Sequence, residues 1–105
     1  MDQNTLNAIQ AQAFRGLIAH LQNRTDAQNI DIMNLAGFCR NCLSKWVLAA
    51  SNELDAGLDY DAALEMVYGM PYSEWKEKHQ EKASEEQLET FEKTKPLHAK
   101  ISGHQ

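Results

Sequence analysis

The middle of this 105-residue chain reads IDIMNLAGFCRNCLSKWVLAASNELD over residues 30–55. At 100° per residue, most of its apolar side chains fall within about 140° of one helical face. They are Ile32, Leu35, Ala36, Cys39, Cys42, Leu43, Trp46, Ala50 and Leu54. The periodicity predicts one long helix from residue 30 to residue 55, which Gly57 ends.

A helix of this length would extend about 40 Å, which exceeds the width of a compact domain of this size. It also carries Met33, Phe38 and Leu48 outside its main apolar stripe. Surplus length and surplus apolar surface both indicate a partner subunit. The sequence therefore predicts a homodimer that associates through this helix.

Helical patterns continue on both sides of this segment. Residues 4–23 carry apolar side chains at spacings of three and four, which is typical of an amphipathic helix. A short third helix follows Asp59, a residue type that caps helix N-termini, and stops at Gly69. Tyr72, Trp75 and His79 align on a fourth helix.

The block Ser84-Glu85-Glu86-Gln87 matches a capping box that opens a fifth helix. Leu, Met and Ala number 28 against 7 for Ile and Val, which favours helix over strand. We predict an all-α fold, a small multihelical bundle of about five helices with one long central helix. A single domain is expected over residues 1–96, followed by a flexible tail over 97–105.

Charge and hydropathy exclude several partners. Fifteen acidic residues against ten Lys and Arg give a net charge of −5, which repels phosphate backbones, so nucleic acid is not an expected partner. There is no apolar run of the roughly 20 residues that span a bilayer, and the N-terminal residues lack the pattern of a signal peptide. We therefore expect no membrane association and a cytoplasmic location, where thiols stay reduced.

Cys39 and Cys42 have the spacing of metal ligands, because an i, i+3 pair lies on one face of a helix. Zinc needs four ligands. His20 lies at the edge of the apolar stripe of its helix, and His79 lies on the inward side of its own helix, so both are candidate ligands. Two cysteines from one helix with His79 or His20 would pin the helices together. The alternative is a pair of buried thiols that serve only as small apolar side chains.

A third interpretation is a thiol-dependent enzyme that uses Cys39 or Cys42 as nucleophile. A reactive thiol is usually found at a helix N-terminus, where the helix dipole lowers its pKa. In a continuous helix about two turns would precede Cys39, and only a break at Gly37 would restore that activation.

Other catalytic classes lack their motifs. Asp55, Asp59 and Asp61 crowd one loop without the glycine and glutamate of a calcium-binding loop. Ser44 has no glycine-flanked elbow, and there is no phosphate-binding glycine loop. No catalytic or cofactor-binding residue follows, so we favour a protein without catalytic activity over an enzyme.

Three blocks carry a family resemblance. They are Gln28-Asn29-Ile30-Asp31, then Asn34-Leu35-Ala36-Gly37-Phe38-Cys39-Arg40-Asn41-Cys42-Leu43-Ser44-Lys45-Trp46, then Tyr68-Gly69-Met70-Pro71-Tyr72 followed by Glu74-Trp75-Lys76. Through them residues 26–95 resemble a family of short bacterial proteins, domain of unknown function 1244. The resemblance implies a small helical protein and no established activity.

The same blocks contain polar residues that flank the apolar stripe of the predicted long helix. They are Asn29, Asp31, Asn34, Arg40, Asn41, Ser44 and Lys45. Our hypothesis is that this flank is an interaction surface; the alternative is a solvated helix face with ordinary caps. The sequence thus favours a helical interaction or accessory module that forms a homodimer, with another protein as a candidate partner and zinc as a candidate cofactor.

Overall fold

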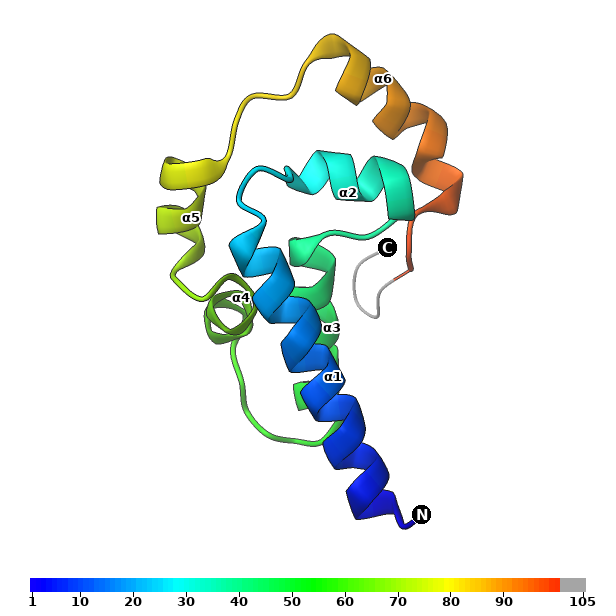
Figure 1. Cartoon of the computed structure of the whole chain (residues 1–105), viewed down its shortest axis with the longest axis vertical. Coiled ribbons are helices and arrows are strands. Elements are labelled where there is room, and N and C mark those ends of the chain that lie inside the picture. Colours follow the sequence, from blue (N-terminus) through cyan, green and yellow to red (C-terminus); the bar gives the residue numbers. More distant parts are fainter. Residues whose placement is uncertain (101–105) are drawn as a thin grey trace.

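The structure is a computed structural model and describes residues 1–100. Within them the chain is all-helical, with six α-helices and one short 3₁₀ helix (Figure 1). The elements are α1 (Gln3–Asn23), α2 (Asn29–Ala36), α3 (Arg40–Glu53), α4 (Tyr60–Tyr68), α5 (Tyr72–His79), α6 (Glu85–Thr94) and η1 (Lys95–Leu97). The predicted all-α fold is confirmed, and the count exceeds the expected five because one predicted helix is divided.

The predicted long central helix is wrong, because the chain turns sharply at Gly37. Gly37 has φ 78°, in the left-handed region, and donates its N–H to the Met33 carbonyl at 2.8 Å. A Cβ on Gly37 would lie 2.7 Å from the Leu97 carbonyl oxygen. Only glycine combines this backbone conformation with so close an approach. α2 therefore ends at Ala36, and α3 begins anew with Cys39 as its N-cap.

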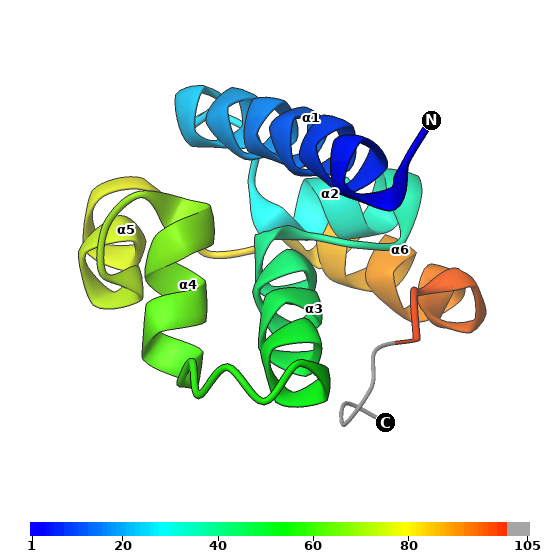
Figure 2. The same cartoon turned by 90° about the horizontal axis from the view of Figure 1, so that it is seen from below.

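The division explains why part of the predicted apolar stripe is not buried. Leu35, at the end of α2, is 90% exposed, whereas Leu43 in α3 is 3% exposed. The longest helix is α1, with 21 residues. It runs along one side of the molecule (Figure 2), and its first half extends beyond the other helices (Figure 1).

The main core lies where α1, α3, α4 and α5 meet. Its buried residues are Leu21, Leu43, Leu64, Val67, Tyr68 and Trp75. α3 packs chiefly on α4, while α2 packs chiefly on α6 and contacts that core through Ile32. Figure 2 shows α4 and α5 on one side of α3 and α6 on the other. The α2–α3 turn therefore lies between two groups of helices.

The predicted helix boundaries in the second half of the chain are confirmed. The Asp59 carboxylate accepts the Ala62 N–H at 2.8 Å, and Gly69 ends α4 with φ 76°. Ser84 and Gln87 form the expected reciprocal capping box of α6. Within residues 1–100, every helix is too short or too polar to span a bilayer.

The start of the predicted tail packs against the rest of the molecule. The Ala99 N–H donates to the Gly37 carbonyl at 2.7 Å. Residues 97–99 thus lie against the turn that precedes the cysteines. Residues 101–105, the rest of the predicted tail, lie outside the described part of the chain.

Candidate functional site

Cys39 and Cys42 lie at the start of α3. Cys39 is the N-cap and Cys42 is the third residue of the helix. Their Sγ atoms are 3.9 Å apart, and both cysteines are free. The side chains are 7% and 6% exposed, so both sulfurs face inward, as the periodicity predicted. They face inward from the beginning of a helix, however, and not from its middle.

The start of α3 makes the two thiols unequal. The pKa of Cys42 is lowered to about 6, chiefly by the hydrogen bond between its side chain and that of Cys39. The Cys39 backbone N–H and the charge of Lys45 add to this effect. The pKa of Cys39 is raised, first by the same hydrogen bond and then by burial. Of the two sulfurs, Cys42 is therefore the one that ionises more readily.

A third sulfur atom completes the surroundings of the pair. The Cys42 Sγ lies 3.7 Å from the Met33 Sδ, which comes from α2. Met33 and Phe38 are partly buried and pack against both cysteines. The turn at Gly37 brings these residues together by folding α2 back toward the start of α3. The site is consequently a small, closely packed apolar cluster with three sulfur atoms, formed by Met33, Phe38, Cys39 and Cys42, which we call the sulfur pocket.

Arg40, between the two cysteines, anchors the start of α3. Its side chain is 1% exposed, and its guanidinium lies 4.8 Å from the centroid of the Trp75 ring. It donates to four oxygen atoms, the carbonyls of Leu21, Arg24 and Ala27 and the Oδ1 of Asn29, at 2.8–3.2 Å. Carbonyls at the end of a helix carry partial negative charge. The carbonyl oxygens at the C-terminal end of α1 therefore take the place of a carboxylate as the partner of the Arg40 charge.

The predicted polar interaction surface is wrong for most of its residues, because they bind within the chain. The Tyr68 hydroxyl donates to Asn41 at 2.6 Å and accepts from Asn29 at 2.9 Å. Ser44 is fully buried and donates to the Arg40 carbonyl. Asn34 donates to the carbonyl of Gln87 in α6. These contacts fasten α2 and α3 to α4 and α6.

The predicted histidine ligands lie on other helices than the cysteines. His79, in α5, stacks edge-on against Trp75 at 4.7 Å, and His20 is exposed on α1. In the described part of the chain, no three His, Cys, Asp or Glu side chains form a group that could hold a metal ion. The structure thus brings together the two predicted cysteine ligands. Zinc with His20 or His79 stays a prediction.

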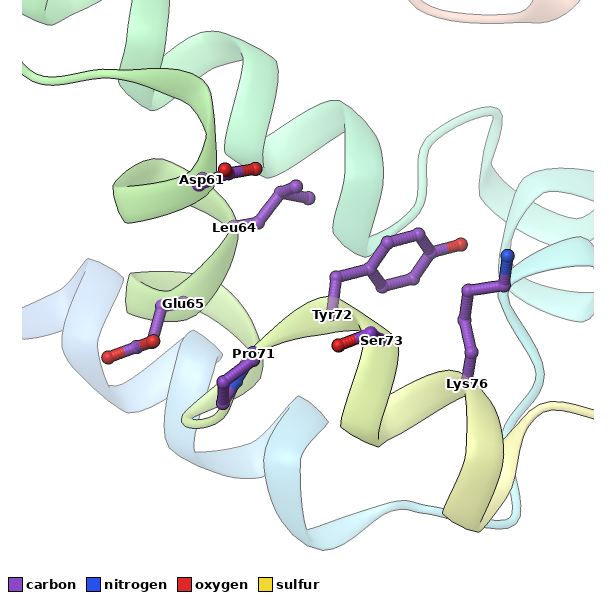
Figure 3. Close-up of a pocket in the computed structure, with 7 residues that line it drawn as sticks. All are labelled: Asp61, Leu64, Glu65, Pro71, Tyr72, Ser73 and Lys76. Carbon is purple, nitrogen blue, oxygen red and sulfur yellow. The ribbon is translucent and has the colours of Figure 1, made fainter.

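A separate hollow of about 530 Å³ lies between α4 and α5. Figure 3 shows Asp61, Leu64 and Glu65 on the α4 side, with Tyr72 and Lys76 on the α5 side. The Lys76 amine lies 5.5 Å from the Tyr72 ring centroid. Neither the cysteines nor any histidine lines this hollow. It therefore adds nothing to the chemistry of the sulfur pocket.

Sequence reasoning missed Met33 and Arg40 as parts of the site. Met33 lay off the predicted stripe because the stripe was drawn for an unbroken helix. Arg40 was placed on the predicted interaction surface for the same reason. The signal for both was Gly37, since a glycine directly before Phe38 and Cys39 allows a helix to stop and a new one to start.

The fold and the site together define a class, an all-helical protein with a reduced Cys-x-x-Cys pair at a helix start. The chain belongs to the family described as protein of unknown function (DUF1244), whose model matches residues 27–93. The resemblance found from the sequence is thereby confirmed. The matched residues begin after α1 and include the whole sulfur pocket. A comparison with curated proteins gave no match.

Proposed function

We propose that Cys39 and Cys42 form a redox-active dithiol that converts reversibly to a disulfide. The observation that carries this proposal is their position at the N-cap and the third residue of α3, with sulfurs 3.9 Å apart. Closing a disulfide requires an S–S bond of about 2.05 Å. Rotation of two neighbouring side chains on one helical turn supplies that approach without moving a helix.

The reaction is thiol–disulfide exchange with a small disulfide. The Cys42 thiolate attacks one sulfur of that disulfide, forms a mixed disulfide and expels one thiolate. Cys39 gives its proton to that thiolate and attacks the Cys42 sulfur, forming the Cys39–Cys42 bond and expelling the second thiolate. The disulfide gains two electrons, takes one proton from Cys39 and a second from solvent, and leaves as two thiols, while the two cysteines lose two electrons and the proton of Cys39.

The surroundings of the pair favour this chemistry. The first turn of α3 directs free N–H groups and the positive end of its dipole at the sulfurs, which stabilises a thiolate. The lowered pKa of Cys42 agrees with that arrangement. We infer a cytoplasmic location from the sequence, and there the reduced form would be the resting state.

The test is oxidation of the reduced protein by glutathione disulfide, followed by mass spectrometry. We expect one intramolecular disulfide, seen as the loss of two hydrogen atoms per chain and reversed by dithiothreitol. Cys39→Ser and Cys42→Ser should each give only the glutathione adduct. Wild-type protein that stays reduced, or that forms only disulfide-linked dimers, would refute the proposal.

A second proposal is that the chain forms a homodimer through α1. Leu6, Ile9 and Leu17 share one face of α1 and are 38–49% exposed. Arg15 is the only Lys, Arg, Asp or Glu in the 21 residues of this helix. An acidic chain repels its own copy least at an uncharged face. A second copy is therefore the occupant that this face fits best.

This proposal moves the predicted dimer contact from the residues 30–55 to α1. The first half of α1 extends beyond the other helices (Figure 1). A single helix in water has little stability of its own. Pairing with a second α1 would bury its apolar stripe. Sedimentation at micromolar concentration should give twice the 11.9 kDa chain mass, and a purely monomeric species would refute the dimer.

A further inference from the structure

The sulfur pocket contains more than a redox couple requires. A disulfide needs two cysteines, yet the Met33 Sδ lies 3.7 Å from the Cys42 Sγ. Met33 comes from a different helix and is placed there by the turn at Gly37. Spacings of 3.9 and 3.7 Å match those of ligands around one ion with metal–sulfur bonds of about 2.3 Å.

We propose that the reduced pocket binds one Cu(I) ion through the sulfur atoms of Cys39, Cys42 and Met33. This inference goes beyond the redox couple, because copper binding uses a third residue and leaves the cysteines reduced. The two activities exclude each other at one site, since a Cys39–Cys42 disulfide has no thiolate left to offer the metal.

The donor set selects a soft monovalent ion. Thiolates and thioethers prefer Cu(I), whereas structural zinc takes four ligands from cysteine, histidine and carboxylate. In residues 1–100, no histidine or carboxylate joins the two cysteines in a metal-binding group. A site with three sulfurs and no nitrogen or oxygen ligand therefore fits Cu(I) and leaves Zn²⁺ without its full ligand set.

The pocket also suits the charge of the complex. Cu(I) with two thiolates carries one net negative charge, which would be unfavourable in an apolar pocket without compensation. The N-terminus of α3 supplies free N–H groups and positive dipole charge at that point. Cu(I) binding would displace the protons of the two thiols, because both cysteines bind the metal as thiolates. Met33 and Phe38 would then shield it from water.

The experiment is an anaerobic titration of reduced full-length protein with Cu(I), in competition with the chromogenic chelator bicinchoninate. We expect one Cu(I) per chain, with three sulfur neighbours in X-ray absorption. Met33→Leu, which conserves volume, should weaken Cu(I) binding by about tenfold and leave two sulfur neighbours. Met66→Leu is the matched control, because Met66 is an exposed methionine on α4, and it should bind as the wild type does.

Two results would overturn the copper site. One is full loss of Cu(I) from the wild type to bicinchoninate, and the other is Met33→Leu protein with unchanged affinity and sulfur count. Circular dichroism of each variant verifies its fold. Disulfide formation in the Met33→Leu variant separates the two proposals. The redox proposal predicts that this variant forms the Cys39–Cys42 disulfide as the wild type does, whether or not copper binds.

Discussion

Cys42 differs from an ordinary buried cysteine because of what surrounds its sulfur. Burial alone would raise its pKa. Instead the Cys39 thiol and backbone N–H groups at the start of α3 stabilise the thiolate, and Lys45 adds a positive charge. The sulfur of Met33 provides a polarisable neighbour. Cys42 thus combines a buried side chain with the lowered pKa that is typical of an activated thiol.

This charge state predicts the pH dependence of alkylation. Because the pKa of Cys42 is lowered to about 6, its thiolate fraction rises through that pH and is nearly complete at neutral pH. The rate of reaction with iodoacetamide should therefore increase from pH 5 and level off above pH 7. Cys39→Ala removes the side chain that forms a hydrogen bond with Cys42, so the pH midpoint of Cys42 alkylation should be higher in this variant. A wild-type midpoint close to the ordinary thiol value of about 8.5 would contradict this assignment.

Arg40 should contribute more to stability than any exposed charge. Replacing it with alanine removes the guanidinium donors from buried and partly buried carbonyls of α1 and the following turn. We expect Arg40→Ala to lower the free energy of unfolding by about 3–5 kcal/mol. Arg40→Lys should recover only part of this, because an ammonium lacks the planar fork.

The control for this substitution is Arg15→Ala. Arg15 is exposed on α1, and its loss should change stability by less than about 0.5 kcal/mol. Urea denaturation followed by the fluorescence of the buried Trp75 measures both variants. Equal effects of the two arginine substitutions would show that Arg40 does not hold α1 to α3.

At the scale of the helices, Gly37 determines how α2, α3 and the C-terminal segment meet. Its left-handed backbone ends α2, and its missing side chain admits the Leu97 carbonyl. The Gly37 carbonyl then accepts the Ala99 N–H. A single residue therefore positions Cys39 at a helix start and places residues 97–99 beside the sulfur pocket.

Gly37→Ala and Gly57→Ala form a matched pair that tests this role. Both glycines have φ 78°, but a Cβ on Gly57 would meet nothing within 4 Å. Gly57→Ala should cost about 1–2 kcal/mol, the cost of a left-handed alanine. Gly37→Ala should cost about 1–3 kcal/mol more, because its Cβ would clash with backbone. Thermal unfolding of both variants measures the two losses of stability. Equal losses would show that the close contact between Gly37 and Leu97 adds no cost.

The sequence allowed the helical class, most boundaries and the cysteine pair to be predicted, for physical reasons. Capping signals act within a few residues, so Asp59, Gly69 and the box at Ser84 could be identified from neighbours alone. Apolar periodicity shows which face of a segment is buried. It does not show whether the segment is continuous, because Leu43 and Ile32 keep their phase on both sides of Gly37.

The features that could not be predicted from the sequence depend on contacts between distant segments. Gly37 packs in its left-handed conformation against Leu97 and Ala99, about sixty positions later in the chain. The acceptors of Arg40 lie on α1 and the following loop, and nothing in the local pattern distinguishes a buried arginine from a solvated one. The place of Met33 in the sulfur pocket likewise follows only from the turn.

At the scale of the whole molecule, the elongated shape results from α1. The molecule measures 48 × 30 × 25 Å, and the first half of α1 accounts for its long axis (Figure 1). The sulfur pocket and the exposed apolar face of α1 lie on different helices. The proposed dimer and the proposed dithiol are therefore separable by mutation.

Ile9→Glu should separate them. A charge at the centre of the exposed α1 stripe should shift the sedimenting species to a monomer while disulfide formation stays unchanged. Leu35→Glu is the control, since Leu35 is more exposed than Ile9 but lies on α2, and it should leave the dimer intact. Dissociation by the control variant alone would assign the contact to α2 instead.

The most direct test of the central claim is the reduction potential of the Cys39–Cys42 couple, measured by equilibrating the protein in thiol–disulfide buffers. A dithiol at a helix start should titrate as a two-electron couple between roughly −270 and −120 mV, the range of exchange-active Cys-x-x-Cys pairs. A couple well below about −300 mV, typical of structural disulfides, or the absence of any intramolecular disulfide would contradict the account.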